Sequence, residues 1–322
     1  DDFGKDAGTN KAIISEIQKG SVTSASIMAN GEDLDGAVSF ALSNSKTSFG
    51  VHLVLDELRP VSKDLYVLKK YGIVCDKGEF VRNKIRTLKL NQEILDAIFV
   101  EWDTQISIIE NKGVIISHID SHHHIHTIPG LCEVLKALML KHQITKVRLA
   151  SYYTFKMLAK GYDILGKGRI YDFVYMLIKY RSIRNRVKWN VSIKESFQTV
   201  DFFSSVLFFW RNRKLFEENW AKMQTIELMC HPGHPHYLSE RQALNSLLEC
   251  DSLIKINYKQ LYRMAKVLHI VLNDYHDDYS YQENLLSQKH KEQGHDVYIV
   301  TSQKYKDSNW EIHYRAIGSY VN

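Results

Sequence analysis

Apolar and polar positions follow two distinct periods along the first two thirds of the chain. Segments with apolar residues at helical spacing alternate with short continuous apolar runs, which are typical of buried strands. The expected helices are Lys11–Lys19, Asp35–Leu42, Leu90–Asn111 and Leu131–Lys141, with a further helical stretch at Leu247–Leu261. The expected strands are Val22–Ala29, Gly50–Leu55, Val114–Ile119, Lys146–Ala150 and Thr225–Cys230. Strands that alternate with helices of this length predict an α/β fold with a parallel sheet.

A second α/β pattern begins near Met264. It consists of a strand at Lys266–Leu272, a helix at Tyr281–Gln293 with Gly294 as its C-cap, and a strand at Asp296–Ser302. This order predicts one βαβ unit. We therefore expect a large domain over residues 1–262 and a partial Rossmann-like βαβ unit over residues 264–322, which is too short for a complete nucleotide-binding domain.

Composition adds little to this organisation. The 322 residues are 44% hydrophobic and 25% charged, as in an ordinary globular protein. The four cysteines are widely spaced and form no CxxC pair, which argues against a disulfide framework or a thiolate zinc site. No apolar run reaches the roughly 18 residues that a membrane-spanning helix needs. We expect a cytoplasmic protein.

The net charge of +5 is concentrated in one segment, because residues 156–188 hold nine lysines and arginines against two aspartates. A solvated face is the simplest explanation, and an anionic surface or a phosphate-bearing substrate is an alternative. Tyr171–Val187 also mixes apolar with basic residues, so peripheral membrane contact is a second alternative. We expect no nucleic-acid partner, and a homodimer stays open.

Histidines gather after one predicted strand. His118–His126 (HIDSHHHIH) holds five histidines and one aspartate within nine residues. A solvated histidine-rich loop or an engineered tag would also give such a run, but this one is internal, interrupted and flanked by a strand. Neutral imidazole is a good ligand for zinc and other transition metals. The segment therefore predicts a metal site, in which some histidines bind the ion and others orient ligands or line the pocket.

The remaining polar candidates gain weight only in combination. Asp1 and Asp2 alone fit a solvated turn, and His52 alone fits a core histidine. Together, one carboxylate and two histidines form a set that leaves coordination positions free. A second carboxylate can then act as general base, and His231, which follows another strand, can protonate a leaving group. Because such residues lie at strand ends, as in barrel and open-sheet enzymes, the sequence predicts a hydrolytic site.

Five motifs in a fixed order carry a resemblance to a known family. They are DDFG at 1–4, VTSASIMANG at 22–31, GVHLVL followed by RP at 50–60, HIDSHHHIHTIPG at 118–130 and ELMCHPG at 227–233. The set resembles the YdjC/ChbG family of carbohydrate deacetylases over about residues 1–262. The resemblance implies a distorted TIM-like (β/α) barrel that removes the acetyl group from an N-acetylated sugar with one divalent metal ion, magnesium or zinc.

The resemblance also implies roles for individual residues. The implied metal ligands are Asp2, His52 and His122, the implied general base and general acid are Asp1 and His231, and Arg148 binds substrate or orients the base. The family pattern further implies an apolar strand ahead of Asp1, so we expect the domain without its first strand. It commonly has glycine where this chain has Leu58. Residues 151–200 match little, and we expect substrate specificity to be determined there.

From Met264 onward the sequence resembles the start of a GT-B glycosyltransferase of the family 4 type, through KVLHIV, QENLL and KEQGHDVYIVTS. We expect no transferase activity from so short a segment. Two alternatives to the deacetylase stay open. One is a metal-dependent hydrolase of another bond, such as a sugar phosphoester, and the other is an inactive carbohydrate-binding relic.

Overall fold

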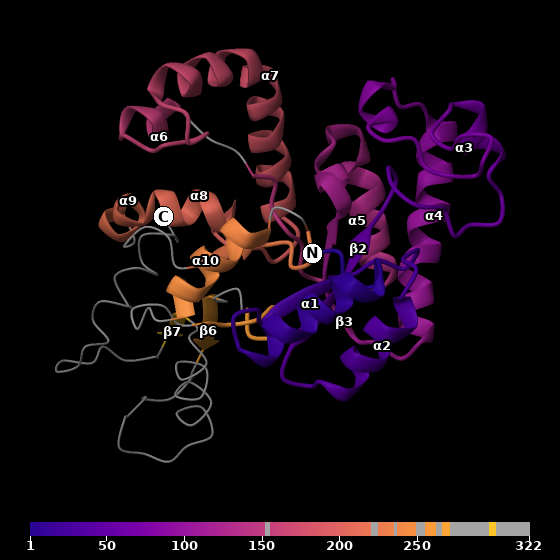
Figure 1. Cartoon of the computed structure of the whole chain (residues 1–322), viewed down its shortest axis with the longest axis horizontal. Helices are drawn as coiled ribbons and strands as arrows, with labels where there is room; N and C mark the ends of the chain where they lie inside the picture. Colours follow the sequence, from indigo (N-terminus) through magenta and orange to yellow (C-terminus); the bar gives the residue numbers. More distant parts are fainter. Residues whose placement is uncertain are drawn as a thin grey trace. The chain divides into compact units, whose positions relative to one another are not determined.

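The computed structural model describes residues 1–151, 155–219, 225–234, 237–248, 255–261, 266–270 and 296–300. The chain divides into two compact units, Asp1–Leu261 and Tyr262–Asn322 (Figure 1). The first unit contains all the residues that the sequence predicts for the active site.

Parallel strands form the centre of the first unit. Strands β1 (Ser24–Ile27), β2 (Ser48–Leu53) and β3 (Ile116–Ser121) pair in that order, and β4 (Phe202–Ser205) pairs with β5 (Ile226–Met229). Single parallel bridges extend the first sheet on both sides, from Phe3 to Ile27, from Ile119 to Val147 and from Lys146 to Gln198. The predicted strand at 146–150 is therefore represented by bridges. The fold is mixed α/β with parallel sheets, as predicted.

Helices occur where the apolar spacing predicts them. They are α1 (Ala7–Gln18), α2 (Leu34–Ser43), α4 (Gln92–Asn111) and α5 (Cys132–Lys141), joined by the short α3 (Tyr66–Lys70), η1 (Lys84–Thr87), η2 (His122–Thr127) and η3 (Pro129–Leu131). Helix α1 begins four residues before the predicted Lys11, because the side chain of Asp6 accepts a hydrogen bond from the backbone of Thr9 and caps the helix there.

The apolar face of α4 forms much of the core. Ile98, Trp102 and Ile106 are fully buried, and α4 packs against β2. Three phenylalanines, Phe3, Phe40 and Phe49, add an aromatic cluster with ring centroids 6.0–6.3 Å apart. This packing fixes Phe3, which follows Asp2 directly, and β2, which carries His52.

The later part of the first unit holds helices that the sequence pattern does not predict and lacks part of one that it does predict. The region 151–200, which matches the family pattern little, contains the 26-residue helix α7 (Arg169–Lys194). The other helices here are α6 (Phe155–Ala159), α8 (Val206–Arg211), α9 (Arg213–Asn219) and α10 (Tyr237–Leu248). The helix expected at Leu247–Leu261 is wrong for residues 255–261, which form turns, because Asn257 Oδ1 accepts hydrogen bonds from the backbone N–H groups of Lys259 and Gln260.

Two strands of the second unit are described. Strand β6 (Lys266–Ile270) pairs in parallel with β7 (Asp296–Val300), where the sequence predicts strands. The helix predicted at Tyr281–Gln293 and its C-cap Gly294 lie outside the described residues. Among the helices that the structure describes, none is long and apolar enough to cross a membrane.

Candidate metal centre

The strands place the predicted ligands at one edge of the first sheet. His52 lies near the end of β2 and is level with Asp120 on β3, and His122 follows β3 directly. Asp2 comes just before the bridge that joins Phe3 to β1. Carboxyl ends of parallel strands meet at one edge, so residues 120 positions apart in the sequence come together there.

The backbone at this edge is unusual. Asp2, His123 and His124 have φ angles of 67°, 49° and 55°, in the left-handed region that residues with a Cβ rarely adopt. Next to Asp2, Gly31 allows the two backbones to meet, since a Cβ on it would lie 2.0 Å from the carbonyl oxygen of Gly4. Strained residues of this kind persist where the surrounding structure fixes them, often at functional sites.

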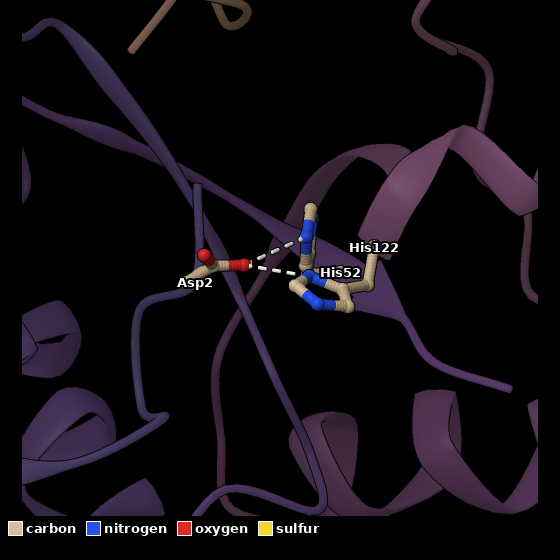
Figure 2. Close-up of side chains that lie close together, drawn as sticks. All are labelled: Asp2, His52 and His122. Atoms are coloured by element: carbon tan, nitrogen blue, oxygen red, sulfur yellow. Dashed lines mark hydrogen bonds and ion pairs between the residues drawn. The ribbon is translucent and has the colours of Figure 1, made fainter. Parts of the chain in front are cut away.

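Asp2, His52 and His122 point toward one another (Figure 2). Asp2 Oδ1 lies 2.9 Å from His122 Nδ1 and 3.2 Å from His52 Nε2. All three residues are buried, and one donor atom from each lies within 4.8 Å of the others. This is the set of two histidines and one carboxylate that the sequence predicts, and it can bind a metal ion.

The hydrogen bonds of the two histidines fit a metal ion. His52 Nδ1 bonds Asp120 Oδ1 at 2.7 Å, and its buried Nε2 faces Asp2 Oδ1 at 3.2 Å. In His122 the two ring nitrogens exchange these roles: Nε2 bonds the supporting carboxylate, Glu57 Oε2, at 2.5 Å, and Nδ1 faces Asp2. A carboxylate on one ring nitrogen fixes the tautomer that offers the other nitrogen as a ligand, as in carboxylate–histidine–zinc triads.

The electrostatics of the cluster favour a bound cation. Burial opposes ionisation of Asp2, but its hydrogen bonds with His122 and His52 hold the pKa of this carboxyl well below its usual range. Burial also opposes the charged forms of the two histidines, yet Asp120 raises the pKa of His52, and Asp2 and Glu57 raise the pKa of His122. Protons and a metal ion therefore compete for the same ring nitrogens.

Arg148 links the metal centre to Asp1. Its guanidinium binds both carboxylate oxygens of Asp1 at 2.8 Å, Asp120 Oδ2 at 2.5 Å and Glu227 Oε1 at 2.7 Å. Burial opposes its charge, but the carboxylates of Asp120 and Glu227 raise its pKa above the ordinary value. The arginine thus holds Asp1 beside Asp120, the carboxylate that bonds His52. These contacts fit the role of orienting the base that the sequence suggests for Arg148.

His231 stands on the outer side of Asp1. Its Nε2 lies 3.7 Å from Asp1 Oδ2 and its Nδ1 lies 3.5 Å from Glu240 Oε1, while its backbone N–H donates to Glu240 Oε2 at 2.7 Å. The side chain of His231 is 31% exposed, unlike that of Asp1. The structure therefore brings together all six residues that the sequence singled out.

Sequence reasoning missed several members of this network, among them Glu240, which contacts His231. Glu57 was not singled out, although it follows β2 just where a polar residue would reach His122. Glu227 and Tyr258 were also missed: Tyr258 donates to Glu227 Oε2 at 2.5 Å, and its ring stacks on His118 with centroids 3.8 Å apart. Glu227 belongs to a quoted motif, but no local pattern indicates that Tyr258 reaches it.

Comparison with known proteins covers the same part of the chain. The family model described as YdjC-like protein matches residues 1–264. A carbohydrate deacetylase of Clostridium beijerinckii is 28% identical over 235 residues, which cover 73% of this chain and 79% of that protein. A carbohydrate deacetylase of Halalkalibacterium halodurans is 32% identical over 235 residues, with coverage of 73% and 83%.

The fold has a solved counterpart. A crystal structure from Enterococcus faecalis, described as a candidate cellobiose-phosphate cleavage protein, is 21% identical and superposes with a TM-score of 0.61. The superposition covers 81% of this chain and 96% of that chain, and at this identity it supports the fold alone. Because the family match spans the whole first unit with its cluster of histidines and carboxylates, this chain belongs to the YdjC-like protein family.

Proposed function

We propose that this protein is a carbohydrate deacetylase, which hydrolyses the N-acetyl group of a sugar and releases acetate with one divalent metal ion. The observation that carries the proposal is the buried Asp2–His52–His122 set, with Asp1 held beside it by Arg148. The family and its relatives named as carbohydrate deacetylases supply the substrate class. The relatives' names and the site's donor atoms support the same chemistry independently.

Asp2, His52 and His122 would hold the ion. Two imidazoles and one carboxylate favour zinc over magnesium, because magnesium prefers oxygen ligands. When bound, the ion supplies Lewis acidity that polarises the acetamide carbonyl and makes water a better nucleophile. The site is fitted for this ion by Asp120 and Glu57, which orient the two imidazoles.

Asp1 and His231 would move the protons. In our proposal Asp1 accepts the proton of the attacking water, and Arg148 holds its carboxylate in place through two hydrogen bonds. His231 then donates a proton from Nε2 to the departing amine, while Glu240 faces its other ring nitrogen. The contacts of Arg148 support the orienting role, and its part in substrate binding stays a prediction.

The partly exposed members of the cluster define where a sugar would enter. The side chains of His231, His123 and Glu57 are 31%, 33% and 34% exposed, whereas His52 is buried.

The predicted barrel would close through residues 1–3. Phe3 forms backbone hydrogen bonds with β1, and the amino group of Asp1 donates to the carbonyl oxygen of Cys230, which follows β5. The glycosyltransferase-like identity of residues 264–322 stays a prediction, which the parallel β6–β7 pair supports.

Acetate release from a panel of N-acetylated oligosaccharides and glycolipids, with zinc or magnesium added to metal-depleted protein, tests the proposal. His122→Ala should lose both bound metal and activity. His142→Ala is the matched control, because His142 bonds Asp103 and Glu110 away from the cluster. Activity in metal-loaded His122→Ala would refute the ligand assignment. Phosphate release from sugar phosphates alone would favour a phosphoesterase, and sugar binding without acetate release would favour an inactive relic.

A further inference from the structure

Helix α7 is anchored to the active-site unit by its carboxyl-terminal half. The ring of Trp189 packs edge-on against His126 with centroids 5.3 Å apart. The side-chain amide of Asn190 bonds both the N–H and the carbonyl oxygen of Ala150, at 2.8 and 2.9 Å. Ala150 lies two residues after Arg148, so this end of the helix is fixed next to the catalytic network.

The amino-terminal half of α7 has one buried and one exposed face. On the inner face, Met176 is fully buried, and the carboxylate of Asp172 accepts hydrogen bonds from the backbone N–H groups of Ile164 and Leu165. Large apolar residues occupy the opposite face: Ile170, Tyr171, Val174, Leu177 and Ile178 are 46–79% exposed. Their spacing of 0, 1, 4, 7 and 8 places them on a single stripe of the helix, which we call the α7 stripe.

The α7 stripe differs from the other exposed apolar residues of the described chain. Phe173, Tyr180 and Val191 are exposed beside it on α7, whereas Leu42, Tyr66, Val100, Leu140 and Leu238 each lie on a different helix. Single exposed apolar residues are ordinary, whereas a contiguous group indicates an interaction surface.

The positive charge around the stripe indicates that its binding partner is anionic. Six exposed cations lie on or next to the helix: Lys167, Arg169, Lys179, Arg181, Arg184 and Lys188. Arg181, Arg184 and Lys188 continue the line of the stripe into the following turns. The only acidic residue of the helix sequence is Asp172, and it is turned inward. A second copy of this chain would bring these cations against their own counterparts, whereas an anionic lipid surface neutralises them.

We propose that the α7 stripe adsorbs to an anionic lipid surface, with its apolar side chains between the headgroups and its cations against lipid phosphates. Helices with an apolar face and a lysine- and arginine-rich flank lie in the plane of a membrane in this way. The carboxyl-terminal half of the helix then keeps the catalytic network close to the lipid headgroups. The inference concerns binding alone and stands independently of the proposed deacetylation.

Sedimentation of the full chain with vesicles tests the inference. The vesicles are made of phosphatidylcholine, with and without phosphatidylglycerol. The apolar variant is Ile170→Ser/Leu177→Ser/Ile178→Ser, and its matched control is Leu42→Ser/Ile115→Ser/Leu140→Ser on other elements. The charge variant is Arg181→Gln/Arg184→Gln/Lys188→Gln, and its matched control is Lys63→Gln/Lys69→Gln/Lys77→Gln.

The full chain should bind the anionic vesicles, lose binding at high salt, and bind pure phosphatidylcholine weakly. The charge variant should bind on the order of 100-fold more weakly, since each basic residue near an anionic surface contributes about 1 kcal/mol. Both controls should bind as the unaltered protein does. Equal binding to both vesicle types, or unchanged binding by either α7 variant, would overturn the inference.

Light scattering after size-exclusion chromatography covers the remaining outcome. A dimer that the apolar variant alone dissociates would assign the stripe to self-association and contradict lipid binding. If the triple variant loses helical circular dichroism, the single substitution Ile178→Glu at a 72% exposed position provides the same test.

Discussion

Replacing Arg148 tests how the centre of the site is held together. Its guanidinium makes four contacts of 2.5–2.8 Å with the carboxylates of Asp1, Asp120 and Glu227. The arginine is 4% exposed and Asp120 is fully buried. Arg148→Met retains much of the apolar stem but leaves three carboxylates close together without their cation.

The expected loss of stability is large. Removing one partner of a buried ion pair costs about 3–5 kcal/mol, because the remaining charge stays buried and uncompensated. Total unfolding free energies of about 5–15 kcal/mol make this a substantial fraction. Arg148→Lys should lose less, since it keeps the charge but not the planar fork that serves several carboxylates. Arg59→Met is the control, because Arg59 is 70% exposed, lies 3.5 Å from Glu79, and should contribute less than about 1 kcal/mol.

Urea unfolding followed by tryptophan emission measures these losses, since Trp102 is fully buried in the core of the same unit. The double variant Arg148→Met/Glu227→Gln should recover part of the stability, because it removes one of the uncompensated carboxylates. If Arg148→Met unfolded within about 1 kcal/mol of the unaltered protein, the three carboxylates would not depend on the arginine, and the reasoning would fail.

The remaining predictions concern metal and protons. Because the pKa values of His52 and His122 are raised, protons compete with the metal, and the zinc Kd measured calorimetrically should fall as pH rises; a pH-independent Kd would contradict this. Glu57→Gln should weaken zinc binding by roughly 10-fold or more, whereas exposed Glu79→Gln should not. In the metal-free protein, the hydrogen bond with His122 lowers the pKa of Glu57 to about 2. The ionised Glu57 carboxylate therefore contributes its full stabilisation at pH values above the ordinary pKa of a glutamate, and this contribution disappears as the pH falls toward 2. Urea midpoints that do not differ between the unaltered protein and Glu57→Gln across this pH range would exclude that contribution. Burial lowers the pKa of His126 to about 3, so stability should decline as pH falls from about 6.5, and His126→Asn should show a smaller decline in urea midpoint.

Local patterns predicted the elements whose packing follows from their own sequence. The apolar stripe of α4 gives its bounds to within two residues, because every residue of that stripe faces the core. The density of histidines after β3 and the rule that parallel strands end at a common edge predict a metal site of two histidines and one carboxylate, whereas the choice of Asp2, His52 and His122 as ligands follows from the family resemblance. Helix α7 was missed, because apolar residues on both its faces hide the helical period.

The network behind the ligands could not be predicted from local patterns. Arg148 meets Glu227 across 79 residues and Asp1 across 147, and these contacts depend on which strands are neighbours. Tyr258 lies in a turn whose position is set by hydrogen bonds to Ser24 and Ser48 at the starts of β1 and β2. Only the tertiary arrangement places its hydroxyl group against Glu227.

The left-handed residues at the metal centre have a consequence for laboratory evolution. Each of Asp2, His123 and His124 occupies a conformation that costs on the order of 1–3 kcal/mol in this type of residue. Selection for heat tolerance alone should therefore enrich glycine or asparagine at positions 123 and 124, where the backbone strain is relieved without loss of the three proposed ligands. Selection for catalytic turnover should act against the same substitutions wherever they loosen the loop around His122. Sequences selected for heat tolerance and sequences selected for turnover should therefore differ first at positions 123 and 124.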